Sequence, residues 1–480
     1  LFGYHGSALL PAQVLNLIEG AFTLGLISVL LMELTGDRRL TVLLCAAVGW
    51  TYSFWSNAAM VSDHMASCLL AVILFRMLLR EPVTQSRSAR VAGLGFVNGL
   101  AMLMHQTNCL LGVMFLTALF SEIASPTTKA RALFIYASAG AATVAIPYLA
   151  VGIFILGNTT LYDFTFWCFY YAMPGVIDVS GNYGGLKFEK IAELFSGFGA
   201  SVVGGFYWMN RIFEIRPLQR NGVPVLSALA GVMPVFIAIR AMAIQSVRGY
   251  AHSTGKAQRL ALSWFLAYAV LLFWWAPWYY QMWSVPLIGL FFYLGSALHE
   301  KLRRPLAECP SVQFALTAFA VLLLSANSIA AFLPSRDISN NDYYTTTIEI
   351  GKKTNAGDMI VIPGNDEYDT YIPYFIKREV VSLHALLIDH LNDLEGSLET
   401  IGEKISETGS AGHDVFIVSE LRDTARTYAD LYKLHHVDPE VLARFFRQYP
   451  VEDAVATGSL TLYKLGGIRP DQPSRLTASE

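Results

Sequence analysis

The stretch 41–75 reads TVLLCAAVGWTYSFWSNAAMVSDHMASCLLAVILF. It places a polar heptad, VSDHMAS (61–67), between two strongly apolar segments. Each segment belongs to a run close to the ~20 mostly apolar residues that a membrane-spanning helix needs. Asp63 and His64 therefore stand side by side at a predicted membrane boundary. Ionisable groups are costly at such depths, which makes these two candidates for function.

The composition extends this pattern to most of the chain. Of the 480 residues, 54% are hydrophobic and only 15% are charged, and the mean hydropathy is +0.44. Soluble domains carry about 25% charged residues, so a polytopic α-helical membrane protein is indicated. The sequence predicts about ten spans, at 13–34, 40–60, 63–80, 91–106, 108–123, 132–156, 223–243, 260–277, 283–299 and 312–333.

The charge pattern predicts an orientation. The stretches 35–39, 80–90, 125–131, 240–259 and 299–305 are all basic, and all fall on one side of the membrane. An excess of Lys and Arg marks the cytoplasmic side. The outer side then receives HQTN (105–108), the stretch 157–222 with its interfacial helices, WAPWYYQMW (275–283) and the C-terminal tail. We expect a bacterial inner, or plasma, membrane protein with its C-terminal domain in the periplasm or outside.

The chain is predicted to have two domains and a tail. Residues 1–333 carry 20 basic and 13 acidic residues, whereas 334–480 carry 14 and 24. Short β-type runs at 358–363, 379–383, 414–419 and 459–465 alternate with helical patterns at 368–377, 386–405 and 421–434. This alternation predicts an external α/β domain over 334–466. The polar end, 467–480, is predicted to be disordered.

The sequence supports further expectations for two segments near the outer side. LKFEKIAELFSGF (186–198) has an apolar helical stripe suited to the membrane interface. Asn16 and Glu19, one turn apart in the first span, would pair with each other or with a neighbouring segment.

Several polar side chains on the outer side are candidate ligands, each with a plainer alternative. Asp63 could serve catalysis or simply act as a helix N-cap. His105 and Gln106 could line a shared pocket or form a polar turn. Aromatic residues are common at membrane interfaces, yet they also bind sugar rings. The remaining substrate-binding candidates are Tyr279, Tyr280, Gln281, Arg211 and Arg216. The two arginines could recognise phosphate or reach lipid headgroups.

Other classes of site are not supported. The five cysteines have no metal-type spacing, and the sequence holds no Walker A motif, G-x-S-x-G or H-E-x-x-H. No nucleic-acid partner is expected. A metal site is not assigned by spacing.

The stretches NLIEGAFTLGLISVLLMELTGDRRLTVLLCAAVGWTYSFWSNAAMVSDHMASCLLAVILF (16–75) and GLGFVNGLAMLMHQTNCLLGVMFL (93–116) resemble the GT-C superfamily. These are integral-membrane glycosyltransferases, including the protein mannosyltransferase and lipid A aminoarabinose transferase types. The likeness continues through WAPWYYQMWSVPLIGLFF (275–292) and the external domain. It lies in order and layout rather than in a strict motif.

The resemblance implies transfer of a sugar from a polyprenyl-phosphate donor to a lipid, glycan or protein acceptor on the outer face. Asp63 matches the second acidic site of that superfamily, with His64 beside it. The first span and first external loop, which commonly carry the main catalytic carboxylate, have no counterpart here, and we expect them upstream of Leu1. A divalent metal ion could assist the leaving phosphate.

Two other functions compete with this one. A transporter or flippase of a lipid-linked solute would place polar residues near mid-membrane in several spans, whereas here they gather at the outer ends. A non-catalytic scaffold of the cell envelope would tolerate loss of Asp63 and His64.

Overall fold

The structure is a computed structural model that describes most of the chain. The described residues are 9–81, 83, 88–157, 160–169, 189–204, 252–275, 279–302, 304–329, 333, 339, 341–364, 368–390, 393–423, 435, 437–458 and 460–466. The predicted span 223–243, Arg211, Arg216 and the tail 467–480 lie outside them. The chain forms two compact units, one of residues 1–158 with 185–334 and one of residues 159–184 with 335–480.

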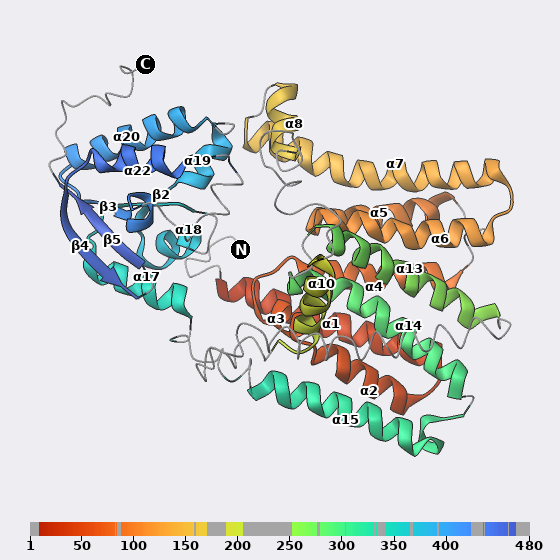
Figure 1. The fold of residues 1–480 in the computed structure, drawn as a ribbon. Coiled ribbons are helices and arrows are strands. Elements are labelled where there is room, and N and C mark those ends of the chain that lie inside the picture. The colour runs from red at the N-terminus through yellow and green to blue at the C-terminus, as the bar shows by residue number, and fades with distance from the viewer. Residues whose placement is uncertain are drawn as a thin grey trace. The chain divides into compact units, whose positions relative to one another are not determined.

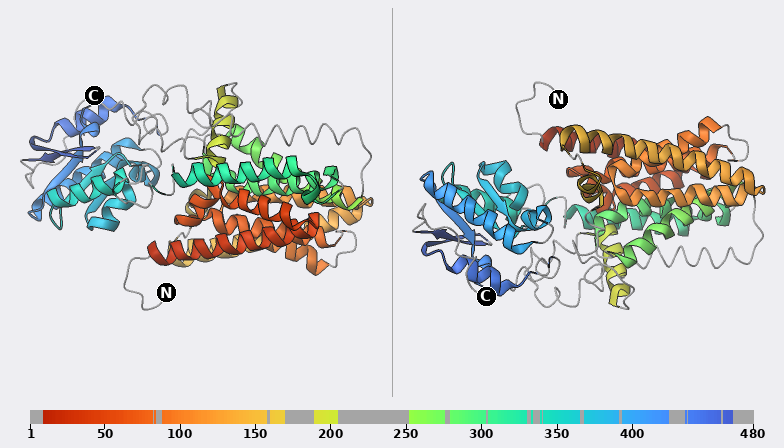
Figure 2. Two further views of the ribbon diagram at one scale, coloured as in Figure 1. Left: turned by 90° about the horizontal axis from the view of Figure 1, so that it is seen from below. Right: turned by 90° about the horizontal axis from the view of Figure 1, so that it is seen from above.

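The first unit is helical, and its long helices run in roughly a common direction (Figures 1 and 2). Its helices are α1 (Leu9–Thr35), α2 (Arg38–Gly49), α3 (Tyr52–Ala59), α4 (His64–Arg80), α5 (Ser88–Met104), α6 (Gly112–Glu122), α7 (Pro126–Ala150), α10 (Glu189–Val202), α13 (His252–Trp274), α14 (Ser284–Leu302) and α15 (Pro310–Asn327). Short turns complete it: η2 (Gln106–Leu111), η3 (Val151–Ile155), η5 (Tyr280–Trp283) and η6 (Leu306–Glu308).

The centre of this unit is α14. All residues from Ser284 to Ala297 are buried, and α14 contacts α1, α2, α4 and α13. Helix α7, by contrast, exposes large apolar side chains such as Phe134 and Ile146, as a helix facing lipid does. The burial of α14 on every side places it in the middle of the helical bundle, as expected for a helix that is apolar all round.

Among the described residues, five helices are long and apolar enough to cross a membrane. They are Pro11–Thr35, Pro126–Ile155, Gly255–Trp274, Tyr280–Leu302 and Pro310–Asn327. The pair α3 and α4 counts as a sixth if it is one broken span, and its two helices are bent by 118°. The protein is therefore an integral membrane protein, while the number of ten spans stays a prediction.

Small residues let two of the helices approach closely. A Cβ on Gly95 would clash with the Tyr136 carbonyl oxygen, and one on Gly99 would lie only 2.7 Å from the Thr143 Cβ. Glycine at these positions of α5 is therefore required for its contact with α7.

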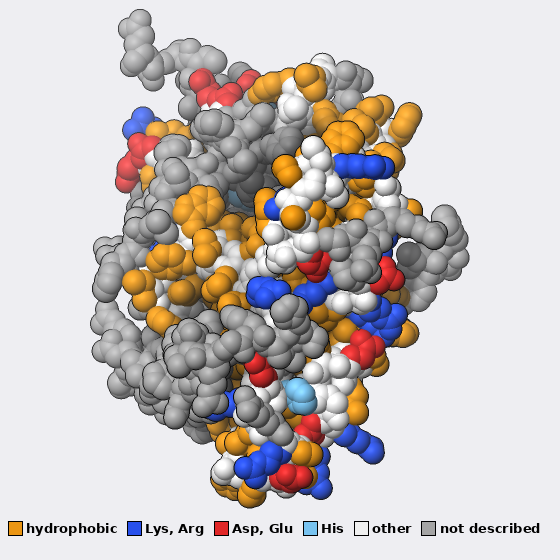
Figure 3. Space-filling model, turned by 90° about the vertical axis from the view of Figure 1, so that its right-hand side faces the viewer, with side chains coloured by type: hydrophobic (Ala, Val, Ile, Leu, Met, Phe, Trp, Pro, Cys, Tyr) orange, Lys and Arg blue, Asp and Glu red, His pale blue; other side chains and the backbone are white. Residues whose placement is uncertain are grey.

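One end of the helical unit is rich in charge, and Figure 3 looks onto it. The exposed basic residues Arg38, Arg39, Arg80 and Arg131 lie in the stretches predicted to be cytoplasmic. Acidic partners balance part of this charge: Glu33 pairs with Arg76 at 2.8 Å, and Glu122 pairs with Lys256 at 2.7 Å. The C-terminal ends of α1, α4 and α6 thus lie at the same end of the unit.

The predicted interfacial segment forms α10, which lies across the ends of its neighbours (Figure 2). The C-terminal part of α10 faces protein: Phe198 and Val202 are 2% and 1% exposed. The Phe198 ring meets that of Trp283 edge-on, with centroids 5.1 Å apart. Of the predicted stripe, Phe198 is thus buried, Leu194 and Phe195 are half-buried, Ile191 is exposed, and Leu186 lies outside the described residues; α10 contacts α3, α13 and η5.

The second unit is an α/β domain with a five-stranded sheet of order β2-β1-β3-β5-β4. Its strands are β1 (Met359–Ile362), β2 (Glu379–Ser382), β3 (Val415–Val418), β4 (Val451–Thr457) and β5 (Leu460–Leu465). Strands β1, β2 and β3 are parallel, while β5 runs antiparallel to β3 and β4. The helical elements grouped with this unit are α8 (Leu161–Phe169), α17 (Asp342–Lys353), α18 (Tyr368–Tyr371), η9 (Ile372–Ile376), α19 (Leu383–Asp389), α20 (Leu394–Ser410), η10 (Ser419–Leu421) and α22 (Pro439–Arg447).

Four of these strands coincide with the predicted β-type runs, whereas β4 was not predicted. The helix predicted over 386–405 is in fact two, because Asp393 caps a new helix by accepting from the Glu395 N–H at 3.1 Å. Of the segment predicted at 421–434, residues 424–434 lie outside the described residues.

Candidate metal and substrate site at the start of α4

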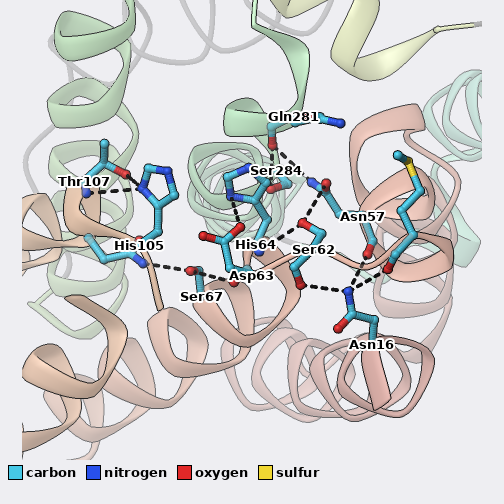
Figure 4. Close-up of polar contacts among 12 residues, drawn as sticks. Asn16, Asn57, Ser62, Asp63, His64, Ser67, His105, Thr107, Gln281 and Ser284 are labelled. Carbon is cyan, nitrogen blue, oxygen red and sulfur yellow. Dashed lines mark hydrogen bonds and ion pairs between the residues drawn. The ribbon is translucent and has the colours of Figure 1, made fainter. Parts of the chain in front are cut away.

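The break between α3 and α4 carries the polar heptad. Asp63 occupies the N-cap position of α4, but among the described residues its carboxylate makes no capping hydrogen bond. It lies instead 3.8 Å from Nδ1 of His64, as Figure 4 shows. The Asp63 side chain is 48% exposed and that of His64 only 8%. The plain capping role does not account for this carboxylate.

The second histidine arrives from the tip between α5 and η2. The His105 ring stands beside that of His64, with centroids 5.2 Å apart and planes tilted by 39°. One ligand atom each from Asp63, His64 and His105 lie within 4.8 Å of one another. The two tips that each carry a histidine therefore converge.

This donor set fits a divalent cation. Imidazole nitrogen and carboxylate oxygen are common ligands of Zn²⁺ and of other first-row divalent metals. Nδ1 of His105 lies 2.7 Å from the Thr107 hydroxyl. The same atom accepts from the Thr107 backbone N–H at 3.3 Å, so Thr107 holds the orientation of the His105 ring through two contacts.

The aromatic tip lies against the same break. The backbone oxygen of Gln281 accepts from the Asn57 side-chain amide at 3.1 Å and from the Ser284 hydroxyl at 2.9 Å (Figure 4). The Tyr280 ring lies 5.0 Å from that of Tyr52 at the start of α3. Asn57 thus links η5 to the last turn of α3 before the break, whereas Tyr280 packs at the opposite end of α3.

A buried asparagine fastens the histidine tip. Asn108 is 1% exposed, and its Oδ1 accepts from the Tyr268 hydroxyl of α13 at 2.6 Å. Its Nδ2 donates to the Ser67 hydroxyl and to the Ala101 carbonyl, both at 2.8 Å. The Ser67 hydroxyl in turn donates to the Asp63 carbonyl at 3.0 Å. The network ties α4, α5 and α13 together one turn below the candidate ligands.

The predicted site residues separate into three groups. Asp63, His64 and His105 come together, while Gln106 is exposed at the start of η2. Tyr279, Tyr280 and Gln281 lie at η5, against α3. Arg211 and Arg216 lie outside the described residues.

Sequence reasoning missed Thr107, Asn57 and Tyr268 as supporting residues. Thr107 belongs to the polar HQTN tip, whereas Asn57 and Tyr268 lie in largely apolar helices. The available signal was the polarity of α3, in which Ser53, Ser56 and Asn57 interrupt apolar and aromatic residues, and all three are buried.

Chemically, the arrangement offers a partly exposed carboxylate beside a buried imidazole. A carboxylate in this setting can accept a proton on one oxygen while its other oxygen binds a cation. The site stands at the end of α4 opposite to Arg80, about 25 Å away along a helix of 17 residues.

Two solved structures are similar to nearly the whole chain. The first is that of ArnT from Cupriavidus metallidurans bound to undecaprenyl phosphate: 12% identity and a TM-score of 0.44, covering 95% of this chain and 83% of that one. The second is the Archaeoglobus fulgidus oligosaccharyltransferase tethered to an acceptor peptide: 11% identity and a TM-score of 0.39, covering 97% of this chain and 63% of that one. No protein-family profile and no curated protein sequence matches. Both TM-scores are below 0.5, so the function proposed below is drawn from the residues of this chain.

Proposed function

We propose that the protein is a glycosyltransferase that moves a sugar from a polyprenyl-phosphate donor to a cell-envelope acceptor on the outer face of the membrane. The observation that carries the proposal is the convergence of Asp63, His64 and His105 at the end of α4 away from the basic loops. The resemblance of 16–75 and 93–116 to the GT-C superfamily supports the same reaction.

In the proposed reaction, an acceptor hydroxyl oxygen attacks the anomeric carbon of the donor. The bond between that carbon and the phosphate oxygen breaks, and the polyprenyl phosphate leaves with the electron pair. The Asp63 carboxylate accepts the proton of the attacking hydroxyl. His64, buried beside it, orients the carboxylate. Tyr279, Tyr280 and Gln281 bind sugar hydroxyls in this proposal.

The phosphate requires positive charge. A divalent cation held by Asp63, His64 and His105 would offset the charge that develops on the leaving phosphate. Arg211 and Arg216 are proposed to contact the same phosphate, since guanidinium groups bind phosphate in a bidentate manner. The polyprenyl tail would lie between the apolar helices, which explains why this chemistry is built into a membrane protein.

The orientation is proposed from the positive-inside rule, with α4 beginning outside and ending in the cytoplasm. Single cysteines at Val61 and Thr127, both exposed, test it in a background in which the exposed Cys109 is replaced. A membrane-impermeant thiol reagent added to intact cells should label position 61 and spare position 127. Labelling of position 127 alone would reverse the orientation.

The activity itself is tested with full-length protein in lipid nanodiscs, supplied with polyprenyl-phosphate sugars and envelope acceptors. Asp63→Asn should lower the transfer rate at least about 100-fold, the usual contribution of a general base. His105→Ala should also lower the transfer rate, because it removes a ligand of the cation that would offset the charge of the leaving phosphate. Glu81→Gln, an exposed acid at the opposite end of α4, is the matched control and should keep the wild-type rate.

Two results would overturn the proposal. If Asp63→Asn and His105→Ala both transfer sugar at the wild-type rate, the site is wrong. If no donor supports transfer while vesicles containing the protein move a lipid-linked solute across the bilayer, the protein is a transporter.

A further inference from the structure

Asn16 of α1 reaches across to the break between α3 and α4. Its side chain is buried, and Nδ2 lies 3.3 Å from the Asn57 carbonyl oxygen and 2.7 Å from those of Met60 and Ser62. Figure 4 shows these contacts gathered on one amide nitrogen. We infer that Asn16 is a positioning residue, which holds the break so that Asp63 and His64 meet His105. The inference rests on the cation site of the proposed function.

The reason for an amide at this position lies in the backbone. The carbonyls in the last turn of a helix, such as that of Asn57, and those of the turn that follows have no partner within the helix, and a carbonyl withdrawn from water without a donor costs free energy. Helix α3 ends at Ala59, and the chain then turns by 118° before α4 begins. Within that turn the carbonyls of Met60 and Ser62 point to one place. An NH₂ group carries two hydrogens on one nitrogen and can serve both at once.

Ser62 connects Asn16 to the candidate ligands. The Ser62 hydroxyl donates to Asn57 Oδ1 at 3.2 Å and accepts from the His64 backbone N–H at 3.1 Å. Asn57 is itself fully buried. The backbone is thus fixed on the near side of Asp63 by Asn16 and Ser62.

On the far side of Asp63, the Ser67 backbone N–H and hydroxyl both donate to its carbonyl, at 3.2 Å and 3.0 Å. Only the carboxylate of Asp63 extends toward the exposed surface, while its backbone is held on both sides. A cation site needs its donor atoms in place before the ion arrives, and groups behind the ligands commonly change metal affinity 10- to 100-fold. Asn16 is such a group, although it lies more than 40 residues away in the sequence.

The test compares substitutions at two buried positions of α1. Asn16→Leu keeps the approximate volume and removes both donors, and Asn16→Gln keeps the donors but displaces them by about one methylene. The control is Thr23→Val. Thr23 is fully buried, and its hydroxyl donates to the Glu19 carbonyl of its own helix at 2.7 Å. The control therefore removes a buried hydrogen bond of α1 that does not touch the break.

Two measurements are made on full-length protein in nanodiscs. Hydrogen exchange of the amides in 60–67 reports whether the break is held, and titration with Mn²⁺ and Co²⁺ reports the affinity of the cluster. Asn16→Leu should speed exchange in 60–67 about tenfold and weaken cation binding at least about tenfold. Asn16→Gln should fall between wild type and Asn16→Leu in both. Thr23→Val should match wild type in both, and exchange in 394–410 of the α/β domain should be unchanged in every variant that folds.

The outcomes separate the inference from the proposed function. Unchanged exchange in Asn16→Leu overturns the inference, and so does faster exchange with unchanged cation affinity, because Asn16 would then be structural only. If Asn16→Leu does not fold, the same two criteria are applied to Asn16→Gln. If wild type binds neither ion, the proposed cation site is wrong, while faster exchange in 60–67 would still support Asn16 as the residue that holds the break.

Discussion

Replacing Tyr268 with Phe tests the network beneath the candidate site. The substitution removes one hydroxyl, which donates to Asn108 Oδ1 at 2.6 Å between side chains that are 2% and 1% exposed. A stranded buried acceptor costs about 1–3 kcal/mol. Hydrogen bonds between membrane helices average only about 0.6 kcal/mol, with a maximum near 1.7, so we expect a loss of about 1–2 kcal/mol.

The matched control is Tyr136→Phe on α7. The Tyr136 hydroxyl is also buried, but it has no hydrogen-bond partner among the described residues. Its removal should therefore leave stability unchanged or raise it. The free energy of unfolding is measured in SDS titrations of detergent-solubilised protein, followed by tryptophan fluorescence.

A double-mutant cycle with Asn108→Leu shows where the loss arises. When both partners are apolar, no acceptor is stranded by the loss of the hydroxyl, so Tyr268→Phe should cost little in the Asn108→Leu background. Equal losses for Tyr268→Phe and Tyr136→Phe, or full additivity in the cycle, would refute the reasoning.

Three further predictions follow from single contacts. Thr107→Val should weaken cation binding about tenfold by removing the hydroxyl contact that helps to hold the His105 ring, and Thr107→Ser should restore it, as measured by Mn²⁺ titration. Gly99→Ala should destabilise the helical unit by about 1–3 kcal/mol in the same SDS titrations, because its Cβ has no room, whereas Gly25→Ala, in open space on α1, should be neutral or stabilising. Burial holds the pKa of His384 below its usual value, so the unfolded α/β domain takes up a proton first, and its free energy of unfolding should fall as the pH drops below about 6.5. His384→Gln should reduce that slope in urea pulse-proteolysis of the full chain between pH 5 and 8.

The sequence was sufficient for elements whose burial follows a simple pattern. Strands β1 and β3 are buried at every residue, and their runs of β-branched residues identify them. Strand β4 was not predicted because most of its residues are exposed and VEDAVAT shows no clear alternation of apolar and polar residues. The sequence showed an apolar stripe in α10 but not which of its residues pack on protein: Phe198 is buried and Ile191 is exposed. A stripe that meets lipid and one that meets protein look alike in sequence.

The candidate site was predictable as a set of residues more than as a geometry. Asp63, His64 and His105 were identified because charged and polar residues are conspicuous between apolar segments. Their separation of 4.8 Å or less could not be predicted, because it depends on how the HQTN tip returns beside α4. For Asn16 of the first span, the sequence left open whether it pairs with Glu19 or with a neighbouring segment. Its three contacts are all with the neighbouring segment.

By itself, the sequence determined that the chain enters a membrane, which loops share a side, and that an α/β domain follows. These properties depend on composition and on local period, which each segment carries alone. Only the tertiary structure decided that a histidine 41 residues away joins Asp63 and His64. The supports of that cluster, from Asn16 and Tyr268, come from helices far apart in the sequence. No local pattern encodes such pairings, because they exist only once the helices have packed.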